Sequence, residues 1–217
     1  MVLGVVMIAT MLPTMIGLNQ ATQSTRDQEE DRRANARKTR THLMATCTLD
    51  QGTLEQRKEI HNAHVQVGLD GKLYITKHPS STMVPFNGGY FTHPEFPPEN
   101  TAGMVTVSGE ETPTLRWVFL DALTHELRWG GRDESAGQIC GPYDWTKDEL
   151  YMTLDGWEGW LAVRLPEDED QAEGDGEDDE ITNGRWRLYF DQNDNGADLP
   201  SGAQVLEIRL KRVLSDS

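Results

Sequence analysis

The stretch HVQVGLDGKLYITK, residues 64–77, predicts a β-hairpin whose loop length can be worked out from its apolar residues. A two-residue turn at 70–71 would mix apolar and polar side chains on each face of the pair. A three-residue loop over 69–71 instead sets Val67 opposite Leu73 on one apolar face. We therefore predict an antiparallel hairpin in this register, since a slip of one residue would turn every side chain to the other face.

The segment TLRWVFLDALTHELRWG, residues 114–130, has the same alternation and predicts a second hairpin. A five-residue loop over 121–125 sets Phe119 opposite Leu127. The apolar residues of this pair then lie on a single face, which can cover a core.

Two further antiparallel pairs are expected nearer the C-terminus. Residues 150–154 can face residues 161–165 across the turn DGWEGW, and residues 184–190 can pair with residues 204–212. In the last pair, apolar side chains alternate with charged ones, as in a sheet with one solvated face. The side chains expected to point inward are Trp186, Leu188, Phe190, Leu206, Ile208 and Leu210.

The remaining patterns complete an all-β architecture with few helices. Residues 41–49 alternate like a first strand, and Thr53 with Gln56 forms a capping box that predicts a short helix ending near His61. Repeated hairpins at this spacing are typical of an antiparallel β-sandwich or barrel, here of about 8–10 short strands. The predicted fold is therefore all-β, with an N-terminal helix and one short helix.

The net charge of −16 is concentrated in one segment of this 217-residue chain. Residues 167–180, EDEDQAEGDGEDDE, hold ten carboxylates and no base, and without them the remainder carries −6. The run has almost nothing to bury, so we predict a disordered acidic insertion over 167–183. An acidic surface repels phosphates, which argues against nucleic acid as a partner. The two cysteines, Cys47 and Cys140, leave a single disulfide open.

The N-terminal segment 1–25 has no charged side chain and is followed by a charged linker, 26–40, and by a β-domain, 41–217. Three interpretations stay open for it: a membrane anchor, a secretory signal, or an apolar helix packed on the domain. Its apolar run 2–18 would span about 25 Å as a helix, slightly less than the hydrocarbon core of a bilayer. The basic flank then predicts membrane association with the domain in the cytosol. The alternatives are a soluble cytoplasmic protein and a secreted one.

The loop YFDQNDNGADLPSG, residues 189–202, matches the start of a calcium loop, D-x-[DN]-x-[DN]-G. The position that should supply a bidentate Glu holds Gly202, and strands are expected on both sides. We interpret the loop as a structural turn, since Asn and Asp tolerate left-handed backbone, with weak calcium binding as the alternative. The candidate calcium ligands are Asp191, Asn193, Asn195 and Asp198.

The turn DGWEGW, residues 155–160, places two tryptophans on either side of a carboxylate. Aromatic rings beside a carboxylate can stack on a sugar or another flat ligand and orient it. The candidate ligand-binding residues are therefore Trp157, Glu158 and Trp160, and the alternative is an aromatic lid over the end of the core. The sequence contains no nucleophile elbow, P-loop, dinucleotide-binding or zinc-protease motif.

Four stretches, MIGLNQAT, GRDESAGQICGPYDW, DGWEGW and YFDQNDNG, resemble a group of small β-rich proteins of filamentous fungi. The resemblance covers most of the chain and implies an apolar start, a charged linker and a β-rich body. It brings no activity, cofactor or site residue with it.

Two classes of function follow from these patterns. The first is a non-enzymatic binding or accessory β-domain, held at a membrane by residues 1–25 and taking a small-molecule or protein ligand. The second is a small β-barrel enzyme of the isomerase or cyclase type, with a pocket inside the barrel. A deep cavity lined by His, Asp or Glu would favour the enzyme. No cofactor is expected apart from the calcium alternative, and no catalytic residue is assigned.

Overall fold

The computed structural model describes residues 23, 25–33, 35–37, 39–48, 51–91, 93, 102–108, 114–166 and 185–214. The chain divides into two units, residues 1–39 and residues 40–217, and the second is a β-domain. Its helices are α2 (Leu54–Ile60) and α3 (Arg132–Ser135). Its strands are β1 (Thr41–Cys47), β2 (Ala63–Val67), β3 (Leu73–Thr76), β4 (Val84–Pro85), β5 (Gly88–Phe91), β6 (Gly103–Val107), β7 (Leu115–Leu120), β8 (Leu127–Gly130), β9 (Tyr143–Trp145), β10 (Met152–Leu154), β11 (Trp160–Arg164), β12 (Trp186–Phe190) and β13 (Gln204–Leu214).

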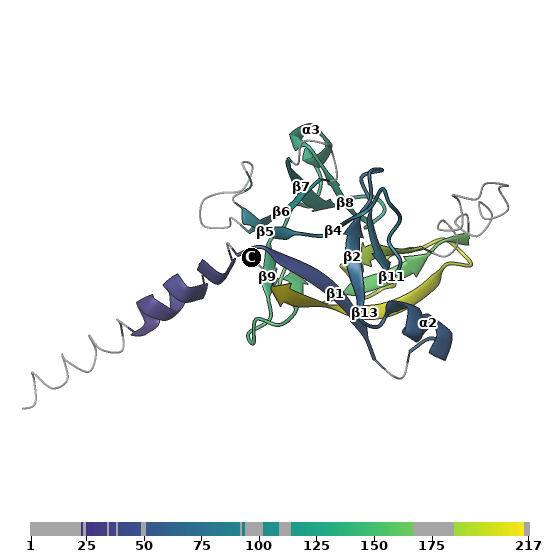
Figure 1. Ribbon diagram of the computed structural model, residues 1–217, viewed down its shortest axis with the longest axis horizontal. Coiled ribbons are helices and arrows are strands. Elements are labelled where there is room, and N and C mark those ends of the chain that lie inside the picture. Colours follow the sequence, from purple (N-terminus) through teal and green to yellow (C-terminus); the bar gives the residue numbers. More distant parts are fainter. Residues whose placement is uncertain are drawn as a thin grey trace, which may run out of the picture. The chain divides into compact units, whose positions relative to one another are not determined.

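Six of these strands close into an antiparallel barrel in the order β1, β2, β3, β12, β11 and β13. Strand β13 pairs with the whole of β1, and the two run side by side in Figure 1. The ring is closed where Ala45 of β1 lies opposite Ala63 of β2. The predicted all-β antiparallel fold is confirmed in its barrel form, with more strands than the expected number of about 8–10.

The interior of the barrel is packed with apolar side chains from all six strands. Every inward-facing residue predicted on segments 184–190 and 204–212 is buried, so that assignment of faces is confirmed. The rings of Trp160 and Phe190 meet edge to face with centroids 4.8 Å apart. Burying one large apolar side chain contributes about 1.5–3 kcal/mol to stability. The interior side chains together are therefore the main source of the stability of the domain. The interior residues are Leu43, Ala45, Ala63, Val65, Val67, Leu73, Ile75, Trp160, Ala162, Trp186, Leu188, Phe190, Leu206, Ile208 and Leu210.

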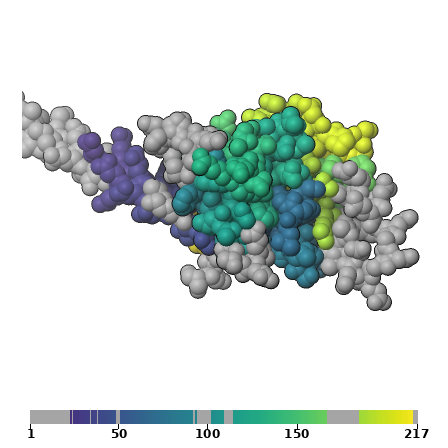
Figure 2. All heavy atoms as spheres, turned by 90° about the horizontal axis from the view of Figure 1, so that it is seen from above, coloured from purple at the N-terminus to yellow at the C-terminus, as the bar shows by residue number. Residues whose placement is uncertain are grey.

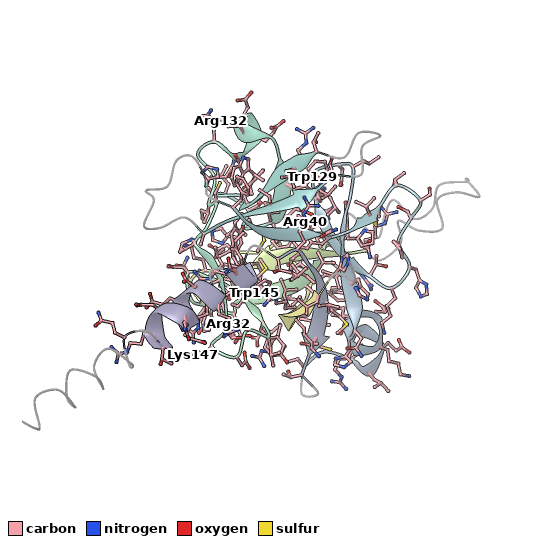
Figure 3. All side chains as sticks on the ribbon, turned by 60° about the vertical axis from the view of Figure 1, so that its left-hand side comes forward. Arg32, Arg40, Trp129, Arg132, Trp145 and Lys147 are labelled. Atoms are coloured by element: carbon pink, nitrogen blue, oxygen red, sulfur yellow. The ribbon has the colours of Figure 1, made fainter. Side chains whose placement is uncertain are left out.

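A four-stranded arm, β5 to β8, leaves β1 and returns to the barrel at β3 and β12. The Trp129 indole N–H on β8 donates to the Gly68 carbonyl over 2.8 Å. The backbones of Lys72 and Arg128 form an isolated antiparallel β-bridge. In Figure 2 the teal and green residues of the arm lie against the blue residues of the β2–β3 region. Figure 3 places Trp129 on the arm and Arg132 at its outer end, on α3.

The hairpin over residues 64–77 has the predicted register. Val67 lies opposite Leu73, and all four side chains at this pair and at the adjoining pair, Val65 and Ile75, are buried. The Gly68 N–H donates to the Lys72 carbonyl over 3.0 Å, which closes the loop with three residues between them. The Asp70 side chain accepts the Lys72 N–H within this loop over 3.3 Å, and it leaves the register set by the apolar alternation unchanged.

The predicted register of the hairpin over residues 114–130 is wrong by one residue. Phe119 lies opposite Arg128, and Leu120 lies opposite Leu127. The cause is Asp121, whose carboxylate accepts the N–H groups of Leu123 and Thr124, each over 2.9 Å. That local turn shortens the loop, because the Asp121 N–H then donates to the Glu126 carbonyl. Trp117 is consequently only partly buried.

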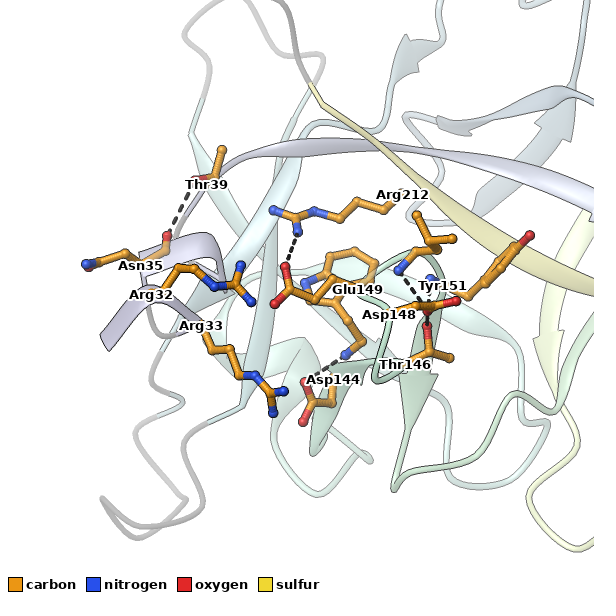
Figure 4. A network of polar contacts seen from close by, with 12 residues as sticks. Arg32, Arg33, Asn35, Thr39, Asp144, Thr146, Asp148, Glu149, Tyr151 and Arg212 are labelled. Carbon is orange, nitrogen blue, oxygen red and sulfur yellow. Dashed lines mark hydrogen bonds and ion pairs between the residues drawn. The ribbon is translucent and has the colours of Figure 1, made fainter. Parts of the chain in front are cut away.

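The expected pairing of residues 150–154 with 161–165 is also wrong. Strand β10 pairs with β9, where Met152 lies opposite Trp145, while β11 lies between β12 and β13. The predicted direct pairing of residues 184–190 with 204–212 is wrong as well, because β11 lies between β12 and β13. The inward-facing residues of both segments were predicted correctly. A tight turn over 146–151 redirects the chain before β10. Figure 4 shows Asp148 hydrogen-bonded to Thr146 in this turn, and the Asp148 carboxylate also accepts the Leu150 N–H over 3.2 Å.

The short helix α2 has the predicted capping box. The Gln56 N–H donates to Thr53 Oγ1 over 3.2 Å, and the Thr53 N–H donates to Gln56 Oε1 over 2.8 Å. Both cysteines, Cys47 and Cys140, are free thiols, which closes the disulfide question left by the sequence.

In the first unit, the described residues 25–33 and 35–37 are helical, where the sequence suggested only a charged linker. Arg32 and Glu29 form an ion pair of 2.8 Å one turn apart, and Thr39 Oγ1 donates to the Asn35 carbonyl (Figure 4). Of the residues that the structure describes, none belongs to a helix both long and apolar enough to span a membrane. The apolar run 2–18 and the acidic insertion 167–183 lie outside the described residues.

Candidate functional site

A groove on the outer face of β11 and β13 brings the two sequence candidates together. Its volume is about 280 Å³, and the turn DGWEGW forms one wall while the loop after β12 forms the other. The turn DGWEGW leads into β11 and the loop follows β12, and these two strands pair with Trp160 opposite Phe190. The pairing therefore fixes the distance between the turn and the loop. The groove is lined by Thr46, Thr48, Trp157, Glu158, Gly159, Trp160, Leu161, Asp191, Asp194, Glu207, Ile208 and Arg209.

Trp157 is the aromatic side chain that the groove exposes, with 45% of its surface open to solvent. Its indole N–H donates to the Asp191 carbonyl over 3.0 Å, which fixes the ring by its polar edge. A Cβ at Gly159 would lie 2.1 Å from the indole nitrogen, so only glycine lets the ring lie this close to the backbone. The ring is therefore held in one orientation by the protein itself.

Glu158 beside it is held by an arginine of the neighbouring strand. Arg209 on β13 donates to the two carboxylate oxygens over 2.7 and 3.1 Å. The Arg209 guanidinium also lies over the Tyr151 ring, 3.6 Å from its centroid. The hydrogen bond that Arg209 donates to Glu158 raises the pKa of Arg209, so the guanidinium stays charged. A fork of two hydrogen bonds orients the Glu158 carboxylate along the groove.

Trp160, the third residue of the predicted ligand-binding set, has its side chain in the barrel interior. It is fully buried, and its indole N–H donates to the Met152 carbonyl over 2.7 Å. The turn ends one residue earlier than the sequence suggested, so Trp160 is the first residue of β11. Trp160 is among the residues that line the groove, but its ring is buried and so offers no face on which a ligand could stack.

The loop that follows β12 is organised by the side chain of Asp191. Its carboxylate accepts the Asn195 N–H over 3.0 Å and the Gly196 N–H over 2.8 Å. Burial alone would raise the pKa of this carboxyl, but the N–H groups of Gly196 and Asn195 outweigh burial and hold the pKa below its ordinary value. The Asp191 carboxylate thus caps a turn.

This geometry supports the interpretation of the loop as a structural turn. Asn195 Oδ1 accepts the Ala197 N–H over 3.3 Å, so two of the four candidate calcium ligands are engaged within the loop. Among the described residues, no group of three His, Cys, Asp or Glu side chains is arranged to hold a metal ion. Asn193 and Asp198, the other two candidate ligands, are exposed.

A second hollow of about 390 Å³ continues the groove. It shares Leu161, Asp191, Asp194 and Glu207 with the first hollow, so the two meet along these residues. Gln51 closes its far side, where its side-chain amide donates to Glu207 and its Oε1 accepts the Glu207 N–H over 3.0 Å. Gly52, Gly196 and Val205 complete the lining, and Val205 is 41% exposed.

Sequence reasoning missed the part of the site that comes from distant strands. Glu207 and Arg209 occur in the outward alternation of β13, which was visible in the sequence, but nothing there says that β13 lies beside β11. Thr46 and Gln51 come from the beginning of the domain. A correct pairing of β1, β11 and β13 was the signal needed to find them.

One buried carboxylate, Glu126, lies away from the groove at the junction of arm and barrel. Burial raises the pKa of Glu126, and Lys72, Arg187 and Arg128 oppose the rise without cancelling it. The nearest guanidinium nitrogen, on Arg187, is 3.7 Å from the carboxylate. The backbone of Glu126 forms an isolated antiparallel β-bridge with Tyr189 of β12. We therefore assign Glu126 a structural role in joining the arm to the barrel.

Comparison with known families gives one match that covers most of the chain. The model of the fungal beta-trefoil domain matches residues 17–216. The chain therefore belongs to the fungal β-trefoil domain family, which agrees with the all-β barrel and with a fungal β-rich group. Comparisons with curated proteins and with solved structures gave no significant match. Membership of this family supports a binding β-domain without catalytic activity.

Proposed function

We propose that the protein binds a hydroxyl-rich, sugar-like ligand in the groove beside Trp157. The observation that carries the proposal is the half-exposed indole of Trp157, fixed by its bond to the Asp191 carbonyl. An apolar ring face suits the C–H face of a sugar, and the energy of ordering the ring has already been spent on folding. The carboxylate of Glu158 and the hydroxyl of Thr48 line the same groove and can accept hydrogen bonds from sugar hydroxyls.

The barrel interior favours binding over the enzyme interpretation. A barrel enzyme needs an internal cavity lined by ionisable side chains. The described strands fill the barrel with apolar side chains, and both hollows of the groove lie on its outer face. The Glu158–Arg209 pair and the Asp191 cap bind groups of the protein itself, so they supply no free acid and base pair.

The test is a glycan-binding screen on the full-length protein and on three variants. Trp157→Ala removes the ring, and Gly159→Ala keeps the ring but displaces it, because the added Cβ meets the indole. Phe91→Ala is the matched control, since Phe91 is also exposed, at 55%, but does not line the groove. We expect Trp157→Ala and Gly159→Ala to show no binding to the glycans that the wild type and Phe91→Ala bind. Retention of every signal by Trp157→Ala would overturn the proposal.

We further propose that residues 1–25 associate the domain with a membrane. The support is the uncharged run followed by Arg26, Arg32 and Arg33, which matches an anchor with a cytosolic domain. Full-length protein should pellet with membranes after carbonate extraction, whereas a chain starting at residue 41 should stay in the supernatant. Full-length protein in the supernatant would remove the anchor interpretation.

A further inference from the structure

The two hollows beside Trp157 differ in what they offer a ligand. The first has the exposed ring at its end, and the second has the exposed aliphatic side chain of Val205. They meet along Leu161, which forms an apolar floor, and along the side chains of Asp194 and Glu207. A single sugar on Trp157 would occupy the first hollow and leave the second empty.

The charge along the groove is uneven. Glu158 is paired with the Arg209 guanidinium, whereas Asp191 accepts neutral backbone N–H groups and so adds to the acidic character of the groove. Asp194 and Glu207 form no ion pair with a described residue, and both line the two hollows where these join. The amide of Gln51 bonds Glu207 without cancelling its charge. An anionic ligand would therefore be repelled at the junction, whereas a cationic group there would be attracted.

We propose that the groove holds a linear chain of at least two sugar units and prefers units that carry an ammonium group. This rests on the proposed function, because the first unit stacks on Trp157. The next unit then lies over Leu161, with its ammonium group between Asp194 and Glu207. The remaining length reaches Val205 and Gln51. The ligand class is an amino-sugar oligomer.

A neutral or cationic peptide is the main competitor for an acidic groove. The aromatic platform favours a sugar, because a ring held flat and half-exposed offers one extended face for a pyranose. A polylysine chain would use Asp194 and Glu207 and could place an ammonium group over the ring, but it has no apolar face that covers the ring as a pyranose does. Dependence on Trp157 and dependence on charge are therefore separate properties that one set of ligands can resolve.

The experiment is calorimetric titration of the full-length protein at mildly acidic pH, where sugar amines are charged. The probes are glucosamine as monomer, dimer and tetramer, the N-acetylated tetramer, a galacturonate tetramer and tetralysine. We expect the glucosamine tetramer to bind about tenfold tighter than the monomer and about fivefold tighter than its N-acetylated form. Raising the salt concentration should reduce the preference for the charged tetramer over the N-acetylated one, because salt screens exposed charges. The double variant Asp194→Asn, Glu207→Gln should also reduce it.

Equal affinities for the charged and acetylated tetramers, with both lost in Trp157→Ala, would overturn the ammonium preference and leave the proposed function standing. Equal affinities for monomer and tetramer would overturn the two-unit groove. Tighter binding of tetralysine than of any sugar would make the ligand a basic peptide. Binding that Trp157→Ala leaves unchanged would instead remove the proposed function itself. If the double variant unfolds, the salt dependence of the wild type decides the charge preference alone.

Discussion

Trp157 and Trp160 lie three residues apart and have opposite roles. Each donates its indole N–H to a backbone carbonyl, Trp157 to Asp191 over 3.0 Å and Trp160 to Met152 over 2.7 Å. Trp160 is fully buried, whereas Trp157 remains 45% exposed. A hydrogen bond therefore does not distinguish a core tryptophan from a surface one. What distinguishes them is the side of β11 on which the ring lies: the barrel interior or the groove.

The largest effect is expected for Trp160→Ala. Removal of this ring leaves a cavity among Phe190, Ile208 and the other interior residues, so we expect the free energy of unfolding to fall by about 3–5 kcal/mol. Chemical denaturation measures it. A loss as small as that of Trp157→Ala would show that the barrel interior repacks freely, and the contrast between the two rings would disappear.

Asp191→Ala removes the carboxylate that caps the loop holding Trp157. We expect a loss of about 1.5–3 kcal/mol at neutral pH, because two backbone N–H groups lose a charged acceptor. The folded-state pKa is lowered, so this stabilisation is present above the ordinary pKa of an aspartate and disappears as the pH falls through the folded value.

The pH dependence supplies the control for that variant. Unfolding curves of the wild type and Asp191→Ala should differ most at neutral pH and converge in acid. Curves that stay parallel throughout would show that Asp191 contributes through packing, and the capping account would fail. Millimolar calcium, compared with chelator, should leave both curves in place if the loop is only a turn.

Gly196→Ala tests the same loop through its backbone. Gly196 has φ +84°, where a side chain is strained, although a Cβ there would contact nothing within 4 Å. We expect a loss of about 1–2 kcal/mol from backbone strain alone. Gly196→Asn is the matched variant, since asparagine tolerates this region better. Thermal melting that ranks asparagine below alanine would contradict this explanation.

The smallest change in stability is expected for Trp157→Ala. Half of the ring is already exposed, so the loss should be about 1 kcal/mol, mainly from its hydrogen bond to Asp191. The loss of ligand binding should be large by comparison. A destabilisation as large as that of Trp160→Ala would mean that Trp157 is a structural lid and not a binding surface.

The sequence was informative where side-chain alternation alone determines pairing. It predicted the register that sets Val67 opposite Leu73, the capping box of α2, and the inward faces of β12 and β13. It failed where a polar side chain reshapes a turn, as Asp121 does for the pair β7–β8. Barrel closure depends on contacts between distant segments, and local alternation carries no information about them.

The same limit explains the outcome at the candidate site. The motifs DGWEGW and DQNDNG were visible separately, but only the position of β11 between β12 and β13 brings Trp157 to Asp191. Trp160 could not be separated from Trp157 by residue type, because the strand begins within the motif. Glu207 became part of the site only through its pairing with Leu161.

The most direct test of the binding surface is a ¹H–¹⁵N spectrum of the tryptophan indoles during titration with the glucosamine tetramer. All tryptophans report in one experiment, so each ring serves as a control for the others. We expect a progressive shift of the Trp157 indole signal, with the Trp160 signal unchanged behind β11. A Trp157 signal that stays in place while binding saturates and another indole shifts would contradict it.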